Sequence, residues 1–113
     1  MPLSNKVSFD PIRSVAFGAI TNAFVALGAA LEGPASAMLF NNLTDAIIQI
    51  SFNGTDVHMQ LSATNSNGIN FTEGGYNNSP LYMAANTQIY VRYIGAAPTV
   101  QSFWIEVMRP QLV

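Results

Sequence analysis

The sequence predicts an all-β fold, a small antiparallel β-sandwich or jelly-roll-like domain, and three observations carry this prediction. Short segments with alternating apolar and polar residues recur, turn-forming residues separate them, and no segment has the 3.6-residue period of an amphipathic helix. About six to eight short strands of this kind suit a sandwich. With 113 residues and no cysteine, the chain is expected to be one domain whose core forms without disulfides.

The clearest element is a hairpin over residues 46–61, in which Asn53-Gly54 is expected to form a two-residue primed turn. This register places a mostly apolar set on one face: Phe52 with Thr55, Ile50 with Val57, Ile48 with Met59, and Ala46 with Leu61. The other face is mostly polar: Ser51 with Asp56, Gln49 with His58, and Ile47 with Gln60. A one-residue slip would mix the faces, so the turn and the alternation predict the same buried face.

Three further segments alternate in the same way. In residues 37–41, Met38 and Phe40 oppose the other side chains, and residues 41–45 follow as a turn. Residues 88–94 and 103–108 are expected to be strands, separated by a turn at residues 95–98. In the first of these strands Ile89, Val91 and Tyr93 lie on one side, with Tyr90 and Arg92 on the other. In the second, Phe103, Ile105 and Val107 lie opposite Trp104 and Glu106.

The first third of the chain admits more than one interpretation. Val15, Phe17 and Ala19 fit a strand, whereas the alanine-rich residues 22–31 are compatible with a helix. Gly18, Gly28 and the Glu32-Gly33-Pro34 segment that ends this stretch favour two strands and a loop. The uncharged residues 14–31 also resemble a signal peptide or membrane helix, but Thr21 and Asn22 at the centre and Asp10 upstream argue against both.

The remaining segments are expected to be exposed. Residues 64–80 are rich in Asn, Ser and Gly and are expected to form a long loop, with a short extended piece near residues 69–71. Residues 1–11 and 110–113 are expected to be flexible arms that order only when a neighbour captures them.

The charge content limits the classes of function. Only 9% of the residues are charged against 50% hydrophobic, while soluble domains average about 25% charged. Other protein chains are therefore expected to cover part of the apolar surface. The four basic residues are scattered and the net charge is −2, which argues against nucleic-acid binding.

Catalytic and metal chemistry have few candidate residues. A Ser-His-Asp triad would have to use His58, the one histidine, which is expected to be a solvated strand residue. His58 and Asp56 alone do not make a metal site. A glycosidase pair would come from two of the six carboxylates, Asp10, Glu32, Asp45, Asp56, Glu73 and Glu106. The carboxylates next to turn residues are expected to cap a turn or to be solvated. Glu106 is the most notable, on a face either exposed or packed against another subunit. No catalytic, cofactor-binding or metal-binding residue is therefore assigned, and the chain is expected not to be an enzyme.

Two other motifs invite a binding interpretation. Aromatic residues would form a sugar-binding face if they gathered on one side, although packing explains them more simply: Tyr76, Tyr82, Tyr90, Tyr93 and Trp104. Gly74-Gly75 lacks the context of a phosphate loop. Four Asn-x-Ser/Thr sequons begin at Asn42, Asn53, Asn70 and Asn77, a number expected by chance in a chain with eleven Asn.

Several stretches together resemble small virion structural proteins of tailed bacteriophages. They are residues 26–31 (ALGAAL), 39–45 (LFNNLTD), 50–54 (ISFNG) and 86–91 (NTQIYV), within a resemblance that spans roughly residues 24–108. The sequence departs from the family pattern where Leu43 is inserted and where Asn53 replaces the common aspartate. The resemblance implies a β-sandwich subunit present in many copies in the virion, with no catalytic residues to transfer.

Composition and resemblance lead to the same functional expectation. The chain is expected to be a non-enzymatic virion protein, most simply a capsid decoration or cement protein that stabilises the shell through subunit contacts. Two alternatives stay open, a neck, collar or tail component and a small carbohydrate- or receptor-binding module. The expected partners are other copies and the major capsid, portal, neck or tail proteins, with no cofactor, nucleic acid or membrane.

Overall fold

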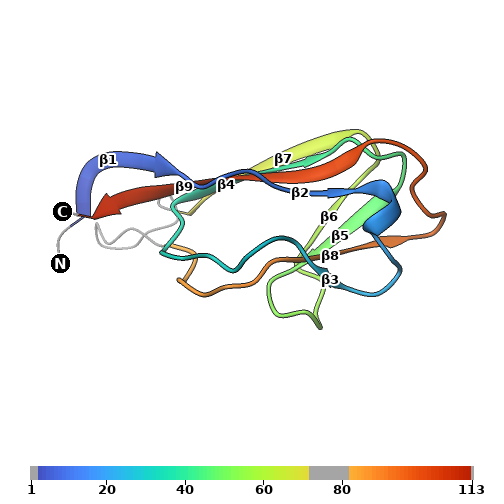
Figure 1. Ribbon diagram of the computed structural model, residues 1–113, viewed down its shortest axis with the longest axis horizontal. Helices are drawn as coiled ribbons and strands as arrows, with labels where there is room; N and C mark the ends of the chain where they lie inside the picture. Colours follow the sequence, from blue (N-terminus) through green and yellow to red (C-terminus); the bar gives the residue numbers. More distant parts are fainter. Residues whose placement is uncertain (1–2, 72–81, 113) are drawn as a thin grey trace.

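The protein folds as a sandwich of two antiparallel sheets, and the computed structural model describes residues 3–71 and 82–112 (Figure 1). Sheet A contains β1 (Leu3–Phe9), β2 (Arg13–Ala16), β4 (Ala37–Asn42), β7 (Asn65–Asn70) and β9 (Ser102–Leu112). Sheet B contains β3 (Val25–Ala26), β5 (Ile47–Ser51), β6 (Met59–Leu61) and β8 (Tyr90–Ile94). The predicted all-β sandwich is confirmed.

The long strand β9 organises sheet A, whose order is β1-β9-β4-β7. One side of β9 pairs with β4. On its other side β9 pairs first with β2 and then, towards its C-terminal end, with β1. The β1–β9 ribbon extends beyond the rest of the sandwich, which gives the molecule extents of 45 × 25 × 22 Å (Figure 1). Sheet B has the order β3-β8-β5-β6.

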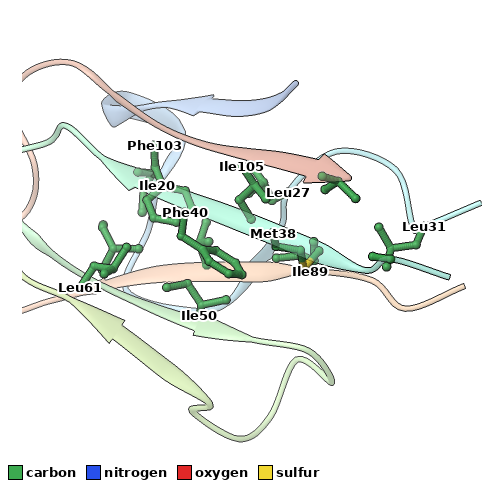
Figure 2. Close-up of a cluster of buried hydrophobic side chains, with 14 residues drawn as sticks. Ile20, Leu27, Leu31, Met38, Phe40, Ile50, Leu61, Ile89, Phe103 and Ile105 are labelled. Carbon is green, nitrogen blue, oxygen red and sulfur yellow. The ribbon is translucent and has the colours of Figure 1, made fainter. Parts of the chain in front are cut away.

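The core lies between the two sheets, where side chains from β4 and β9 face those from β5 and β8 (Figure 2). Fully buried apolar side chains come from both sheets and from residues 27–31: Leu27, Leu31, Phe40, Ile48, Ile50, Ile89, Val91, Phe103, Ile105 and Val107. The alternation predicted for β4 and β9 is confirmed. Met38 and Phe40 are buried on one side of β4 and Leu39 is exposed on the other, and the set of Phe103, Ile105 and Val107 is buried on one side of β9. Burial of these side chains is the main contribution to the stability of the fold.

The predicted hairpin forms, but its register differs by two residues from the expected one. Ile48 pairs with Leu61, Gln49 with Gln60 and Ile50 with Met59. A shift of two residues keeps every paired side chain on its face, so Ile48, Ile50 and Leu61 are buried as predicted. Val57, predicted on the same face, lies in the loop and is 44% exposed. The two-residue primed turn at Asn53-Gly54 is wrong, since residues 52–58 lie outside the paired strands.

Side-chain hydrogen bonds close this longer loop in place of the primed turn. The Ser51 hydroxyl accepts the backbone N–H groups of Asn53 and Gly54 at 3.2 and 2.9 Å. The Asn53 Oδ1 accepts the N–H groups of Thr55 and Asp56, both at 2.9 Å. Asn and Ser readily form local turns of this kind, and here their side-chain hydrogen bonds stabilise a longer loop instead of the two-residue Asn-Gly turn.

The two predicted arms are not free, because their described parts pair with each other. Residues 3–9 form β1, and residues 110–112 form the end of β9 beside it, with Val7 opposite Pro110 and Phe9 opposite Met108. The expectation of flexible arms at residues 1–11 and 110–113 is therefore wrong for these residues. The N-terminal segment and the C-terminal segment therefore act as neighbouring strands for each other.

The predicted loop over residues 64–80 is also wrong in its first part. Residues 65–70 form β7, which pairs with β4 along its whole length, from Ala37 opposite Asn70 to Asn42 opposite Asn65. Strand β7 is an edge strand with mostly exposed side chains, so it lacks the apolar alternation that identifies half-buried strands. The remainder of that prediction, residues 72–80, lies outside the described residues.

The first third of the chain contains short strands, as favoured by the sequence. Residues 13–16 form β2, residues 25–26 form β3, and Phe17–Ala19 form the 3-10 helix η1 rather than a continuation of the strand.

Within residues 3–71 and 82–112, no helix is long and apolar enough to cross a membrane.

Buried polar side chains shape the connection from β4 to β5. The Asn42 Nδ2 donates to the carbonyl oxygens of Ala46 and Ser62 at 2.9 and 3.0 Å, and its Oδ1 accepts the hydroxyl of Thr44 at 2.6 Å. Asn42 and Thr44 are fully buried, and each is satisfied by these bonds. The expected turn at residues 41–45 is therefore a buried polar corner that carries the chain from sheet A to sheet B.

Asp45 joins this corner to the connection between β8 and β9. Its Oδ1 accepts the N–H of Thr99 at 2.7 Å, and its Oδ2 accepts the Thr99 hydroxyl. The side-chain bond from Thr99, followed by the backbone bond from the same residue, lowers the pKa of Asp45. Both bonds favour the charged carboxylate over the neutral acid.

We expect Thr99→Val to raise the pKa of Asp45 towards its ordinary value, because the hydroxyl donor is lost. With a folded-state pKa below the unfolded one, the stabilisation by Asp45 is fully present above the ordinary aspartate pKa of about 3.9 and is lost as the pH falls through the folded-state pKa. Titration of the Asp45 carboxyl by NMR in both proteins measures the change. An identical Asp45 pKa in the two proteins would contradict it.

Candidate functional site

The outer face of sheet A carries cross-strand rows built by the strand register. Residues directly opposite each other in antiparallel strands point to the same face of the sheet. One row contains Phe9, Met108, Ala37 and Asn70; the next contains Glu106, Leu39 and Gly68; the third contains Ser14, Trp104, Asn41 and Ser66. Apolar residues therefore concentrate in the first two rows.

A groove of about 640 Å³ lies over these rows. Its apolar lining includes Phe9, Ile12 and Leu39, whose side chains are 69%, 61% and 41% exposed. Gly68 leaves the groove open beside Leu39, because a Cβ at this position would lie 3.4 Å from Leu39 Cδ1. Exposed large apolar groups that line one concavity are typical of an interaction surface.

One acidic side chain, Glu106, lies among these apolar groups. The Asn41 Nδ2 donates to Glu106 Oε2 at 3.3 Å, and Asn41 Oδ1 accepts the Ser66 hydroxyl at 3.1 Å. These bonds hold the Glu106 carboxylate at the half-buried centre of the face. The arrangement suits an apolar side chain of a partner with a hydrogen-bond donor next to it.

The outer face of sheet B is polar at its centre, beside the apolar cross-strand pair of Ile47 and Ile94. Gln60, Gln49 and Arg92 occupy one row across β6, β5 and β8. Gln49 donates to Gln60 Oε1 at 2.9 Å, and Arg92 Nε donates to Gln49 Oε1 at 2.9 Å. The Arg92 guanidinium also lies 4.4 Å from the centre of the Phe24 ring. The side chains of this central row hydrogen-bond one another, whereas apolar side chains of sheet A line a groove, so of the two outer faces sheet A offers the better docking surface.

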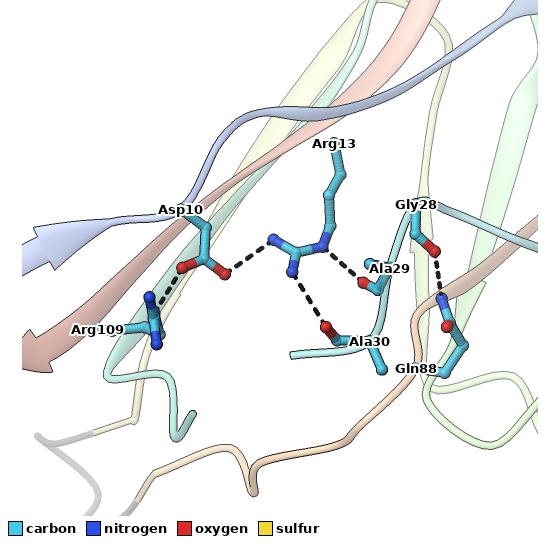
Figure 3. A network of polar contacts seen from close by, with 7 residues as sticks. All are labelled: Asp10, Arg13, Gly28, Ala29, Ala30, Gln88 and Arg109. Atoms are coloured by element: carbon cyan, nitrogen blue, oxygen red, sulfur yellow. Dashed lines mark hydrogen bonds and ion pairs between the residues drawn. The ribbon is translucent and has the colours of Figure 1, made fainter. Parts of the chain in front are cut away.

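A buried ionic cluster holds the strands that frame the groove (Figure 3). The Asp10 side chain is 4% exposed and lies between two arginines, with Arg13 Nη1 at 3.0 Å from its Oδ2 and Arg109 Nε at 2.5 Å from its Oδ1. The contact with Arg109 is an ion pair without a hydrogen bond, whereas Arg13 forms both. Two guanidinium groups therefore surround one buried carboxylate, which supplies their counter-charge.

The same cluster ties the segment before β4 to sheet A. Arg13 Nε donates to the Ala29 carbonyl at 2.9 Å, and Arg13 Nη2 donates to Ala30 at 3.4 Å. Gln88 donates to the carbonyl of Gly28 at 3.0 Å (Figure 3). Asp10 belongs to the junction between β1 and β2, so the cluster fixes the neighbouring groove residues Phe9 and Ile12.

The structure separates the residues considered for catalysis. His58 is exposed and lies in the loop after Phe52, where its Nδ1 accepts the Phe52 N–H at 3.0 Å and its ring stacks on the Phe52 ring at 5.5 Å. Its predicted place opposite Gln49 is wrong, since Gln49 pairs with Gln60. His58 therefore closes a loop, and in the described residues no group of three or more His, Asp or Glu side chains could hold a metal ion.

The carboxylates considered for glycoside hydrolysis are engaged in different places. Asp10 forms ion pairs with arginines, and Asp45 accepts the hydroxyl of Thr99. Asp56 accepts a hydrogen bond from Asn53 Nδ2 at 2.8 Å, and Glu106 accepts one from Asn41 Nδ2. Glu32 is exposed in the connection before β4, and Glu73 lies outside the described residues.

The aromatic residues considered for sugar binding lie on different surfaces. Trp104 is on the outer face of sheet A, whereas Tyr90 and Tyr93 belong to β8 in sheet B and point to opposite sides of that strand. Tyr93 packs against the core. Tyr82 is half-buried before the bridge of Met83 to Ala35, and Tyr76 lies outside the described residues.

The sequence did not single out the groove residues Phe9, Ile12, Leu39 and Met108. A signal was present, because Leu39 and Met108 are large apolar residues at positions that alternate with the buried sets of β4 and β9. Glu106 was placed correctly on the outward side of its strand.

No family model matches the sequence. No curated protein matches it either. A solved structure with some likeness is the crystal structure of the Dit (gp 19.1) protein of phage SPP1, described as a paradigm of the hub adsorption apparatus in phages that infect Gram-positive bacteria. The two share 10% sequence identity with a TM-score of 0.42 over 96% of this chain and 50% of that chain, so this chain spans about half the length of the SPP1 protein. At this level the likeness assigns no function.

Proposed function

We propose that the protein is a non-enzymatic structural subunit of a tailed-phage virion, which binds a neighbouring virion protein through the groove on the outer face of sheet A. The observation that carries the proposal is the contrast between the two outer faces. Sheet A exposes apolar side chains around a groove of about 640 Å³, whereas sheet B carries a row of polar side chains that hydrogen-bond one another.

The low charge of the whole chain supports the same proposal. With 9% charged residues, the protein has few groups to keep its apolar surface in water, and contacts with neighbours reduce that exposed area. The class of particle comes from the resemblance of residues 24–108 to small virion proteins of tailed phages. Complete burial of a large apolar side chain contributes about 1.5–3 kcal/mol, and each partly exposed groove residue contributes a fraction of that, which repetition over many symmetric sites multiplies.

Two locations within the particle fit this proposal. As a capsid decoration or cement protein, the subunit would bind the major capsid protein and oppose shell expansion. As a neck, collar or tail component it would contact portal or tail proteins, and it would then belong with the SPP1 adsorption protein in the same part of a particle. Peptide mass spectrometry on separated heads and tails distinguishes these locations.

We expect Leu39→Lys to lower incorporation of the subunit into particles by about tenfold or more, because the variant loses the apolar burial of Leu39 and also places a charge in the apolar groove. Leu39 is 41% exposed, and a lysine there faces Glu106 and is tolerated by the fold. The measurement is the number of copies per particle after complementation with the variant.

Val57→Lys is the matched control, because Val57 is 44% exposed but lies in the loop between β5 and β6, away from the groove. We expect normal incorporation of this variant and similar thermal unfolding of both. Equal incorporation of Leu39→Lys and the wild-type protein would refute the role of the groove.

A further inference from the structure

The groove on sheet A contains a carboxylate without a basic partner among the described side chains. Two acidic residues line the groove, Asp10 and Glu106. Both ion pairs of the described side chains involve Asp10, so arginines already offset its charge. Glu106 accepts a hydrogen bond from the uncharged Asn41 Nδ2 at 3.3 Å, which is long for a bond to a carboxylate. Glu106 therefore keeps acceptor capacity for a further donor.

The groups around this carboxylate are mostly apolar. Leu39 lies directly opposite Glu106 in the strand register, and Ile12 and Met108 line the same groove. A partner that covers these side chains also removes water from the half-buried Glu106. An ionised carboxylate that loses water is strongly destabilised unless it gains a cation or hydrogen-bond donors. The groove therefore favours a partner that brings a positive charge together with its apolar groups.

An aromatic side chain lies on the same face of the sheet. Trp104 and Glu106 are two residues apart in β9, and both alternate with buried residues of that strand, so they point to the same side. Trp104 also stands opposite Asn41, the residue that donates to Glu106. A planar guanidinium binds a carboxylate through two N–H groups and stacks on aromatic rings, whereas an ammonium acts as a point charge. An arginine matches this pair of groups better than a lysine does.

We propose that the groove binds a segment of a neighbouring protein that packs apolar side chains against Leu39 and Met108 and pairs an arginine with Glu106, beside Trp104. The inference rests on the proposed function, since it names the chemistry of the segment that docks on sheet A. It gives a role to an acid at the centre of a mostly apolar groove. The negative charge rejects apolar segments that lack the cation, and so it determines specificity.

The first test uses three small probes on the isolated protein: hexylguanidinium, hexylurea and hexylammonium. They share one alkyl chain. The guanidinium and urea head groups have nearly the same planar shape, but urea is neutral, whereas the ammonium is charged and not planar. NMR titration of the backbone amides of β4 and β9 measures the affinity for each probe.

Two variants identify the group that recognises the charge. Glu106→Gln removes the negative charge and keeps an oxygen that accepts the Asn41 bond. Glu32→Gln is the matched control, because Glu32 is exposed and does not line the groove. Leu39→Lys confirms the place of binding, since it removes an apolar contact and puts a competing cation opposite Glu106.

We expect the wild-type protein to bind hexylguanidinium about tenfold more tightly than hexylurea, the usual effect of a hydrogen bond between charged groups. Hexylammonium should bind with an intermediate affinity. The preference for hexylguanidinium should disappear in Glu106→Gln, persist in Glu32→Gln and weaken at high salt, because salt screens a partly exposed ion pair. Leu39→Lys should weaken the binding of all three probes.

Four results would overturn the proposal. They are equal or tighter binding of hexylurea, tighter binding of hexylammonium, a preference for hexylguanidinium that survives in Glu106→Gln, and no binding of any probe up to its solubility limit. The second result would assign the site to a lysine, and the first would assign it to a neutral partner.

The incorporation assay separates this inference from the proposed function. Glu106→Gln should lower the number of copies per particle by a factor similar to its loss of affinity for hexylguanidinium, whereas Glu32→Gln should be incorporated normally. If Leu39→Lys lowers incorporation while Glu106→Gln does not, the groove binds a neighbour without a cation, and this inference alone fails. If Leu39→Lys is incorporated normally, docking at the groove fails whatever the probes show.

Discussion

Asp10→Ala is expected to lower the free energy of unfolding by about 3–5 kcal/mol, because it leaves Arg13 and Arg109 without their buried counter-charge. The side chains of Asp10 and Arg13 are 4% and 9% exposed, so water compensates little. The loss should appear in equilibrium urea unfolding at neutral pH. Local exchange of amide hydrogens in β1 and β2 should also increase, since the cluster holds the junction between them.

A double-mutant cycle identifies the cause of this loss. Arg13→Met removes one cation while keeping the volume of the side chain stem, and the pair Asp10→Ala with Arg13→Met should be less destabilised than the sum of the two single changes. A loss below about 1 kcal/mol for Asp10→Ala would show that the cluster contributes little, as surface ion pairs do.

Phe40→Ala is expected to destabilise the fold by about 3–5 kcal/mol, the usual effect of deleting a fully buried aromatic side chain. Phe40 is 0% exposed and lies on β4 between the two sheets (Figure 2). Its ring meets that of Phe52 edge to face, with 6.3 Å between the ring centres. Truncation removes this contact and leaves a cavity.

Phe17→Ala is the control for Phe40→Ala. Phe17 is 40% exposed in η1, and its truncation should change stability by much less, roughly 1 kcal/mol or below. Chemical denaturation of the two variants under identical conditions provides the comparison. Similar losses for both variants would contradict the position of Phe40 at the core.

The alternation of apolar residues was sufficient to predict the central strands and their faces. It placed Met38 and Phe40 on the side of their strand opposite Leu39, and it placed Glu106 on the side opposite the apolar set of its strand, as the structure has them. It also predicted the buried face of the β5–β6 hairpin. The exact pairing was beyond it, because a two-residue shift leaves the faces unchanged and the bonds of Ser51 and Asn53 decide the loop.

The edges of sheet A were not predictable from local pattern. Strand β7 is polar and exposed, and it is a strand because β4 supplies its hydrogen-bond partners. Strand β1 and the end of β9 likewise depend on pairing between opposite ends of the chain. Such pairing is a property of the tertiary fold, and a single segment carries no trace of it.

The groove could not be predicted from the sequence for a related reason. Its lining comes from β1, β4, β7 and β9 and from Ile12 between β1 and β2, segments far apart in the sequence. Composition did predict that apolar surface would remain for neighbours to cover. Only the strand register shows that this surface includes the outer face of sheet A, beside Leu39 and Met108.

Location of the subunit in a reconstruction of the intact particle tests the central claim most directly. We expect the outer face of sheet A to lie against a neighbouring protein, with Phe9, Leu39 and Met108 covered and the polar row of Gln49 and Arg92 facing solvent. A subunit whose sheet A faces solvent while sheet B makes the contacts, or the absence of the chain from purified particles, would contradict it.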